Sequence, residues 1–92
     1  MASYMTDKDK IQLRLRKIEG QLKGIEKMID NDKYCIDVLN QLYSSIAATQ
    51  KVAAIVLKDH IKGCVRDAII RNDRSDDYIN ELVEVVERHT RN

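Results

Sequence analysis

A chain of 92 residues without Pro, Phe or Trp must build its core from Ile, Leu, Val, Ala and Met, which favours packed helices over a β-sandwich or barrel. This length allows one small domain, residues 1–92, whose thin helices cannot cover their own apolar stripes, so self-association is expected. The formal net charge of +1 argues neither for nor against nucleic acid as a partner.

Several functional classes are excluded at this level. No apolar run approaches the roughly 18 residues of a membrane span, so no membrane partner is expected. Two cysteines in a chain without a secretion signal indicate reduced thiols in the cytoplasm. An enzyme is not expected, because the sequence has no Ser/His/Asp set, paired-carboxylate pocket or phosphate-cradling Gly loop.

The first predicted helix begins near Thr6, whose hydroxyl can cap it, with Asp9 at the reciprocal position of a capping box. Its apolar residues alternate by four and three over nearly three heptads, which predicts a packing seam: Ile11, Leu15, Ile18, Leu22, Ile25 and Ile29. Gly20 and Gly24 lie off this seam and weaken the helix, which predicts the close approach of another backbone.

A second stripe on the first helix is polar and basic. With the residues that flank it, it consists of Lys10, Arg14, Arg16, Lys17, Gln21 and Lys23. Such a stripe is most often a solvated helix face. Repeated in an oligomer, it would supply phosphate contacts to DNA and make binding steeply dependent on salt.

Residues 30–33 predict a turn, because their short polar side chains compete locally for backbone hydrogen bonds. A long second helix is then predicted from about residue 33 to about residue 70, with Gly63 as the point where it kinks or ends early. A third helix follows Ser75 as its N-cap and ends near Arg88. The fold class is therefore all-α, a three-helix protomer with one long central helix.

The central helix carries three metal-ligand side chains, Cys35, His60 and Cys64. At 100° per residue, His60 and Cys64 return to within roughly 20° of the direction of Cys35. Cys35 and His60 are nevertheless separated by roughly 37 Å along the axis, whereas metal–ligand bonds measure about 2.0 to 2.3 Å. The residues can meet if two such helices pack antiparallel about a two-fold axis, which creates two identical sites.

Two thiolates and one imidazole suit Cu(I) in a low coordination number. Zn(II) is the less favoured ion, because it requires a fourth ligand that this arrangement does not obviously supply. The simpler interpretation is that both cysteines are buried core residues, as cysteines on apolar stripes usually are. A third possibility is a helical protein that merely buffers metal and does not bind DNA.

Three segments, RLRKIEGQLKGIEKMI, YCIDVLNQL and DHIKGCV, resemble the CsoR/RcnR/FrmR family of small helical bacterial repressors over residues 14–65. The resemblance implies antiparallel four-helix-bundle dimers that pair into tetramers, bind operator DNA as apo-protein, and release it when an inducer is sensed. Cys35, His60 and Cys64 match the Cys-His-Cys pattern of the copper-sensing branch. That branch holds Cu(I) trigonally between subunits and derepresses copper efflux genes.

Other branches of the family match less well. Nickel/cobalt sensors use an N-terminal His, which is missing here, and a His at the position of Cys64. Formaldehyde sensors have Pro where this chain has Ala2. Persulfide sensors keep both cysteines but lack a His at position 60. A sulfur-sensing repressor that uses Cys35 and Cys64 is therefore the main alternative.

The resemblance also implies roles outside the ligand set. Tyr34, beside Cys35, resembles the outer-shell tyrosine of copper sensors. Glu81, with Glu84 as the alternative, corresponds to a glutamate that couples the third helix to the metal site by accepting a hydrogen bond. Arg14 matches the DNA-binding surface of the family, Lys51 on the central helix extends it, and Gln21 is a candidate for contact with base edges.

Overall fold

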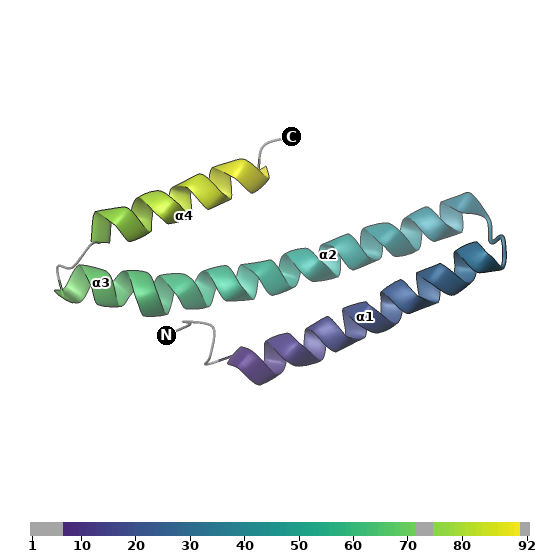
Figure 1. Cartoon of the computed structure of the whole chain (residues 1–92), viewed down its shortest axis with the longest axis horizontal. Helices are drawn as coiled ribbons and strands as arrows, with labels where there is room; N and C mark the ends of the chain where they lie inside the picture. The colour runs from purple at the N-terminus through teal and green to yellow at the C-terminus, as the bar shows by residue number, and fades with distance from the viewer. Residues whose placement is uncertain (1–6, 72–74, 91–92) are drawn as a thin grey trace.

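The computed structural model describes residues 7–71 and 75–90, which are almost entirely helical (Figure 1). Helix α1 spans Lys8–Asp30 and α2 spans Cys35–His60. Without a break, α2 continues into a π-helical turn, η2 (Ile61–Val65), and then into α3 (Arg66–Arg71). Helix α4 (Ser75–Thr90) follows. The predicted all-α protomer with one long central helix is confirmed, because α2, η2 and α3 form a single rod.

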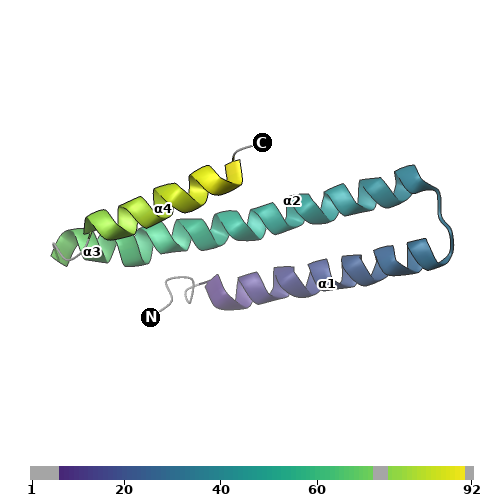
Figure 2. The ribbon, with the colours of Figure 1, turned by 45° about the horizontal axis from the view of Figure 1, so that its top comes forward.

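Helices α1 and α2 lie side by side and antiparallel (Figures 1 and 2). Alternate members of the α1 seam, Ile11, Ile18 and Ile25, are buried. Ile11 and Ile18 pack against Val52 and Ile55 of α2 in one apolar cluster. Full burial of such a side chain contributes roughly 1.5–3 kcal/mol, and these side chains, at 7–9% exposed, approach that limit, so these few contacts hold the two helices together.

The other members of the same seam remain at the surface of the protomer. Leu15, Leu22 and Ile29 are 40, 44 and 59% exposed. A heptad seam normally faces one partner along its whole width. The protomer therefore covers about half of the α1 seam and leaves the rest for another surface.

The turn between α1 and α2 is a Schellman motif. The Asp32 N–H donates to the Ile29 carbonyl at 3.1 Å, and the Lys33 N–H donates to the Met28 carbonyl at 2.9 Å. Asp32 adopts the left-handed conformation that this motif requires, with φ of 54°. The turn predicted over residues 30–33 is confirmed, and it is what returns α2 alongside α1.

Gly63 lies inside the π-helical turn η2, so the central helix does not end there. The Arg66 N–H reaches back to the Ile61 carbonyl, five residues earlier, as in a π-helix. This turn shifts the helical phase of the residues that follow it. Cys35 and His60 share one α-helix, as their predicted common direction requires. Cys64 lies in η2, and its direction relative to the other two stays a prediction.

The ends of the helices differ from the predictions in detail. Thr6 lies outside the described residues; α1 begins at Lys8 with Asp7 at the N-cap position, and the Asp7 side chain makes no capping hydrogen bond. Helix α4 ends at Thr90, two residues beyond the predicted Arg88. A Cβ added at Gly20 or Gly24 would meet nothing within 4 Å among the described residues, so the close approach predicted there does not occur inside the protomer.

The protomer is one helix deep. Its extents are 57 × 31 × 13 Å, and a helix with its side chains is about 10–12 Å across. The radius of gyration is 17.4 Å, against about 12 Å for a compact domain of this length. No described side chain is less than 2% exposed. Among the described residues, no helix is long and apolar enough to cross a membrane.

Candidate metal and nucleic-acid sites

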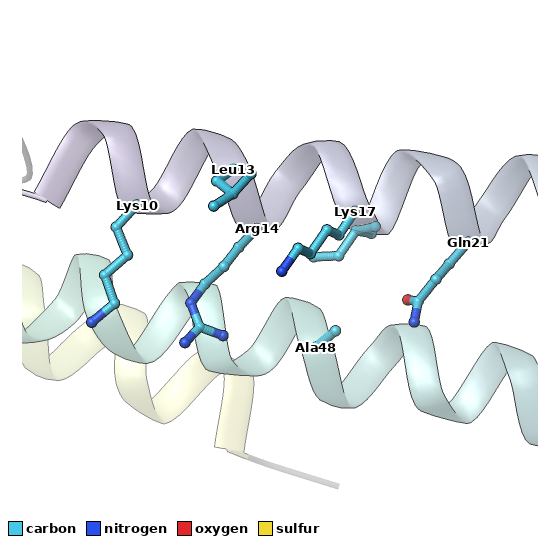
Figure 3. A pocket seen from close by; sticks show the side chains of 7 residues that line it. Lys10, Leu13, Arg14, Lys17, Gln21 and Ala48 are labelled. Carbon is cyan, nitrogen blue, oxygen red and sulfur yellow. The ribbon is translucent and has the colours of Figure 1, made fainter.

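The layer formed by α1 and α2 carries two grooves of different chemistry. The basic groove is lined by Lys10, Leu13, Arg14, Lys17, Ile18, Gln21 and Ala48 (Figure 3). The apolar groove is lined by Ile18, Leu22, Leu42, Ser45, Ile46, Thr49, Gln50, Ala53 and His89. Ile18, from the buried seam, is the one residue common to both linings. Gln21 lies about 60° to one side of Ile18 around α1 and Leu22 about 40° to the other, so the two grooves open on opposite sides of Ile18.

The basic groove collects four of the residues predicted to contact DNA. Figure 3 shows the side chains of Lys10, Arg14 and Lys17 extending from α1 toward α2, with Gln21 further along the same helix. Their spacing of four, three and four residues places them on one stripe. The seven lining residues include three cations and no carboxylate. The groove can therefore attract an anionic partner such as a nucleic-acid backbone.

Two further residues predicted to contact DNA lie outside this groove. Arg16 is exposed, and at two residues from Arg14 it lies about 200° away around α1. Lys51 is exposed on α2, one turn after Ala48 at the border of the groove. Lys51 can thus extend the basic surface along α2, whereas Arg16 faces away from it.

A buried hydroxyl that sequence reasoning missed contacts the basic stripe. The Ser45 hydroxyl donates to Gln21 Oε1 at 3.2 Å, and Ser45 is 5% exposed. The Thr49 hydroxyl donates to the Ser45 carbonyl at 2.8 Å. The sequence did carry one signal for this buried hydroxyl. The residues of α2 that pack on α1 are spaced alternately by three and four, and the first and last of them are polar: Ser45, Ala48, Val52, Ile55 and Asp59.

Cys35 and His60 lie at opposite ends of α2. Cys35 is the first residue of the helix, is exposed, and borders a shallow depression with Ile29 and Leu39. His60 is the last residue of α2 and is half-buried. Cys64 belongs to η2, and its side chain lies outside the described part of the structure. Among the described residues, no group of three His, Cys, Asp or Glu side chains could hold a metal ion within one chain.

The residues predicted to support the metal ligands are exposed in the protomer. Tyr34 occupies the N-cap position of α2, directly before Cys35. Glu81 is exposed on α4. Glu84 pairs with Arg88, one turn later on the same helix, at 3.3 Å. This exposed pair contributes roughly 0.3–0.5 kcal/mol at most.

A buried carboxyl adjoins His60. Asp59 is 7% exposed, and its Oδ2 has no hydrogen-bond partner among the described residues. Burial raises the pKa of the Asp59 carboxyl. A hydrogen bond with Asp7 and repulsion from that carboxylate raise it further, while Lys58 and Lys62 oppose the shift. Asp7 thus links the start of α1 to the end of α2.

Residues 7–88 match the model of the metal-sensitive transcriptional repressor family. The chain belongs to this family. It is 44% identical over 85 residues to the copper-sensing transcriptional repressor CsoR of Bacillus subtilis (strain 168), covering 92% of this chain and 83% of that one. Because the metal-sensitive repressors regulate transcription, membership also confirms the expectation that the chain is not an enzyme.

Two solved structures share the fold of this metal-sensitive repressor. The copper-sensing repressor CsoR with Cu(I) from Geobacillus thermodenitrificans NG80-2 superposes with a TM-score of 0.88 at 32% identity, covering 95% of this chain and 90% of that one. The nickel-responsive transcriptional regulator InrS gives a TM-score of 0.74 at 30% identity, covering 87% and 89%. The similarity to the copper-sensing protein therefore extends over almost the whole chain.

Proposed function

We propose that this chain is a Cu(I)-responsive transcriptional repressor of the cytoplasm. It binds operator DNA as apo-protein and releases it when Cu(I) binds between subunits, which derepresses copper efflux genes. The observation that carries the proposal is the unbroken helix α2, which holds Cys35 and His60 in one direction at opposite ends of an exposed apolar stripe. The names of its copper-sensing relatives support the same assignment.

The stripe between Cys35 and His60 is symmetric about its midpoint. Its members alternate by four and three: Cys35, Leu39, Leu42, Ile46, Thr49, Ala53, Val56 and His60. An antiparallel pair with its two-fold axis between residues 47 and 48 sets Leu42 opposite Ala53. In the same register Cys35 lies opposite His60 of a second copy. One arrangement therefore buries the apolar stripe and brings the thiol to the imidazole.

The donor set fits Cu(I). Cys35 of one copy, with His60 and Cys64 of the other, supplies two thiolates and one imidazole, which suit a soft ion of low coordination number. Zn(II) would require a fourth ligand. Tyr34 adjoins the Cys35 end. Glu81 is the candidate acceptor that orients the imidazole and couples α4 to the site, with Glu84 already paired to Arg88.

The DNA-binding surface of this proposal is the face opposite the apolar groove. Lys10, Arg14 and Lys17 bind phosphates, Gln21 contacts base edges, and Lys51 adds charge at the margin. Arg16, on the other side of α1, has no contact in this arrangement. One stripe of three cations binds weakly. Pairing of dimers into a tetramer repeats the stripe four times, and the affinity then falls steeply as salt is raised.

Regulation in this scheme is thermodynamic linkage. Helix α2 carries Cys35 and His60 and also borders the basic groove at Ala48, so a subunit arrangement that favours the Cys-His-Cys site can disfavour the spacing of the basic grooves. A coupling free energy of about 1–3 kcal/mol changes operator affinity by roughly 5- to 150-fold. Cu(I) can shift the equilibrium between the DNA-bound and the DNA-free forms only by the difference between its binding free energies for the two forms.

The test is operator release under anaerobic conditions. Fluorescence anisotropy with the operator from the protein's own promoter should show tight apo binding that one Cu(I) per subunit weakens by about 5- to 150-fold. His60→Ala should keep some Cu(I) affinity through the thiols but lose most of the coupling. Asn40→Ala, at an exposed polar residue of α2 that lines neither groove, is the control. Unchanged operator affinity at stoichiometric Cu(I) would refute the proposal.

The exposed thiol of Cys35 favours a second candidate, a persulfide-sensing repressor that uses Cys35 and Cys64. A persulfide donor and Ni(II), added in parallel with Cu(I), separate these inducers. Release by persulfide in His60→Ala, with no response to Cu(I) in the wild type, would assign sulfur sensing. A metal buffer would bind Cu(I) but show no preference for the operator over random DNA.

A further inference from the structure

One hydrogen bond crosses the α1–α2 layer from the apolar groove to the basic groove. Ser45 lines the apolar groove, and Gln21 lines the basic groove. The Ser45 hydroxyl passes between the helices and donates to Gln21 Oε1 at 3.2 Å. Ser45 is 5% exposed, so water has little access to this bond. The exposed carboxamide of Gln21 is therefore anchored by a buried group.

The hydroxyl of Ser45 is directed away from its own helix. A serine inside a helix commonly bonds the carbonyl four residues earlier. Ser45 donates instead to Gln21, 24 residues away in sequence. Thr49 does follow the local pattern, because its hydroxyl donates to the carbonyl of Ser45, four residues earlier. Removing the hydroxyl would leave Gln21 free to sample other rotamers of a long side chain.

The hydrogen bond from Ser45 determines which other hydrogen bonds the Gln21 carboxamide can form. A glutamine amide has two N–H donors and one carbonyl oxygen with two lone pairs. The Ser45 hydroxyl occupies one lone pair of Gln21 Oε1. In the basic groove Gln21 therefore presents mainly the N–H donors of Nε2. A free glutamine pairs with adenine through both amide groups, whereas a donor alone matches acceptors such as guanine O6 and N7 or thymine O4.

We propose that Ser45 is a positioning residue for sequence recognition. It holds the Gln21 carboxamide so that Nε2 faces the DNA, while Lys10, Arg14 and Lys17 bind the phosphates. This inference rests on the proposed function. It adds a specificity determinant that does not itself touch DNA, and it predicts that the base contacted by Gln21 presents an acceptor.

The DNA arm of the test compares operator with random duplex over a salt series. Ser45→Ala should lower operator affinity by about 3- to 10-fold, the effect of losing one hydrogen bond. It should leave affinity for random DNA and the salt slope unchanged, because no phosphate contact is lost. Ser45→Thr should restore the affinity, and Ser44→Ala, at the exposed neighbouring serine, should match the wild type.

A double-mutant cycle separates positioning from a general structural effect. If Ser45 acts through Gln21, Ser45→Ala combined with Gln21→Ala should bind the operator no more weakly than Gln21→Ala alone. Additive losses would overturn the inference. Equal losses on operator and random DNA would also overturn it, because they would indicate a structural change. Ala is the better helix former, so the variant is expected to fold.

The free protein supplies a readout that does not depend on DNA. In 15N NMR, the Gln21 side-chain amide should be well ordered in the wild type and in Ser45→Thr, and mobile in Ser45→Ala. An equally mobile amide in the wild type would overturn the positioning role. A wild-type protein with an ordered Gln21 amide but no preference for the operator would instead overturn the proposed function.

Discussion

Asp32 and Asp59 both occupy positions that are unfavourable for an aspartate. Asp32 holds a left-handed backbone conformation with φ of 54°, which the Schellman turn requires. Asp59 is buried, with one carboxyl oxygen unpaired among the described residues. The turn could be predicted from its short polar residues. The environment of Asp59 could not, because Asp7 reaches it through the packing of α1 on α2.

Asp32→Gly should stabilise the chain by about 1 kcal/mol or somewhat less. A residue with a Cβ pays roughly 1–2 kcal/mol in the left-handed region, and the greater freedom of Gly in the unfolded chain offsets part of the gain. Urea unfolding at fixed protein concentration measures the difference. Asp30→Gly, in the last helical position of α1, should destabilise the chain instead. Loss of stability in Asp32→Gly would contradict this account of the turn.

Asp59→Asn should change how stability depends on pH. The pKa of Asp59 is raised by folding, so this carboxyl favours the folded state below its ordinary pKa. That contribution is lost as pH rises above about 4, where an unfolded aspartate ionises but the buried one resists. Thermal unfolding of metal-free protein between pH 4 and pH 7 should therefore show a smaller loss of stability in Asp59→Asn. Parallel curves for the two proteins would show that the buried carboxyl does not titrate as described.

The long central helix and the seam of α1 are the elements that periodicity predicted best. An apolar pattern of fours and threes and the absence of Pro are local signals, and α1 and α2 follow them closely. The sequence marked Gly63 as an irregular point of the central helix, but it did not show that the irregularity is a π-helical turn, because a π-turn differs from an α-turn by only one residue. Cys64 lies in this turn, so its direction relative to Cys35 and His60 stays a prediction.

Pairing of α2 with a second copy can be tested by a disulfide. In a Cys35→Ser, Cys64→Ser background, Leu42→Cys with Ala53→Cys should form a covalent dimer under mild oxidation. The two positions lie roughly 16 Å apart along one helix, so they cannot bridge within a chain. Leu42→Cys alone should stay monomeric on non-reducing gels, since it faces residue 53. A dimer formed equally well by the single variant would refute the proposed register.

The elongated, one-layer shape of the protomer gives it a small hydrophobic core. Its accessible surface is 7549 Å², about 2,000 Å² more than a compact protein of 10.7 kDa exposes. Apolar residues on α1, α2 and α4 account for part of that excess, including Leu22, Leu42, Ile46, Val83 and Val86. The expectation of self-association from chain length alone is consistent with this one-layer fold.

Stability should therefore depend on protein concentration. The Tm should rise measurably over a hundredfold increase in concentration, because association stabilises the folded chain by mass action. Ile46→Glu, at the centre of the exposed stripe, should reduce the mass found by analytical ultracentrifugation and lower the Tm. Leu13→Glu, on the basic side of α1, should leave the mass unchanged. A Tm independent of concentration would show that the protomer is stable alone.

Local sequence determined the helices, the apolar seam of α1 and the common direction of Cys35 and His60, because helical periodicity follows from residue spacing along one element. It also grouped Lys10, Arg14, Lys17 and Gln21 on one stripe. The tertiary structure alone decided that Ser45 meets Gln21 and that Asp7 meets Asp59. These contacts depend on the register of α1 against α2, which side-chain packing across the whole interface sets and no single segment encodes.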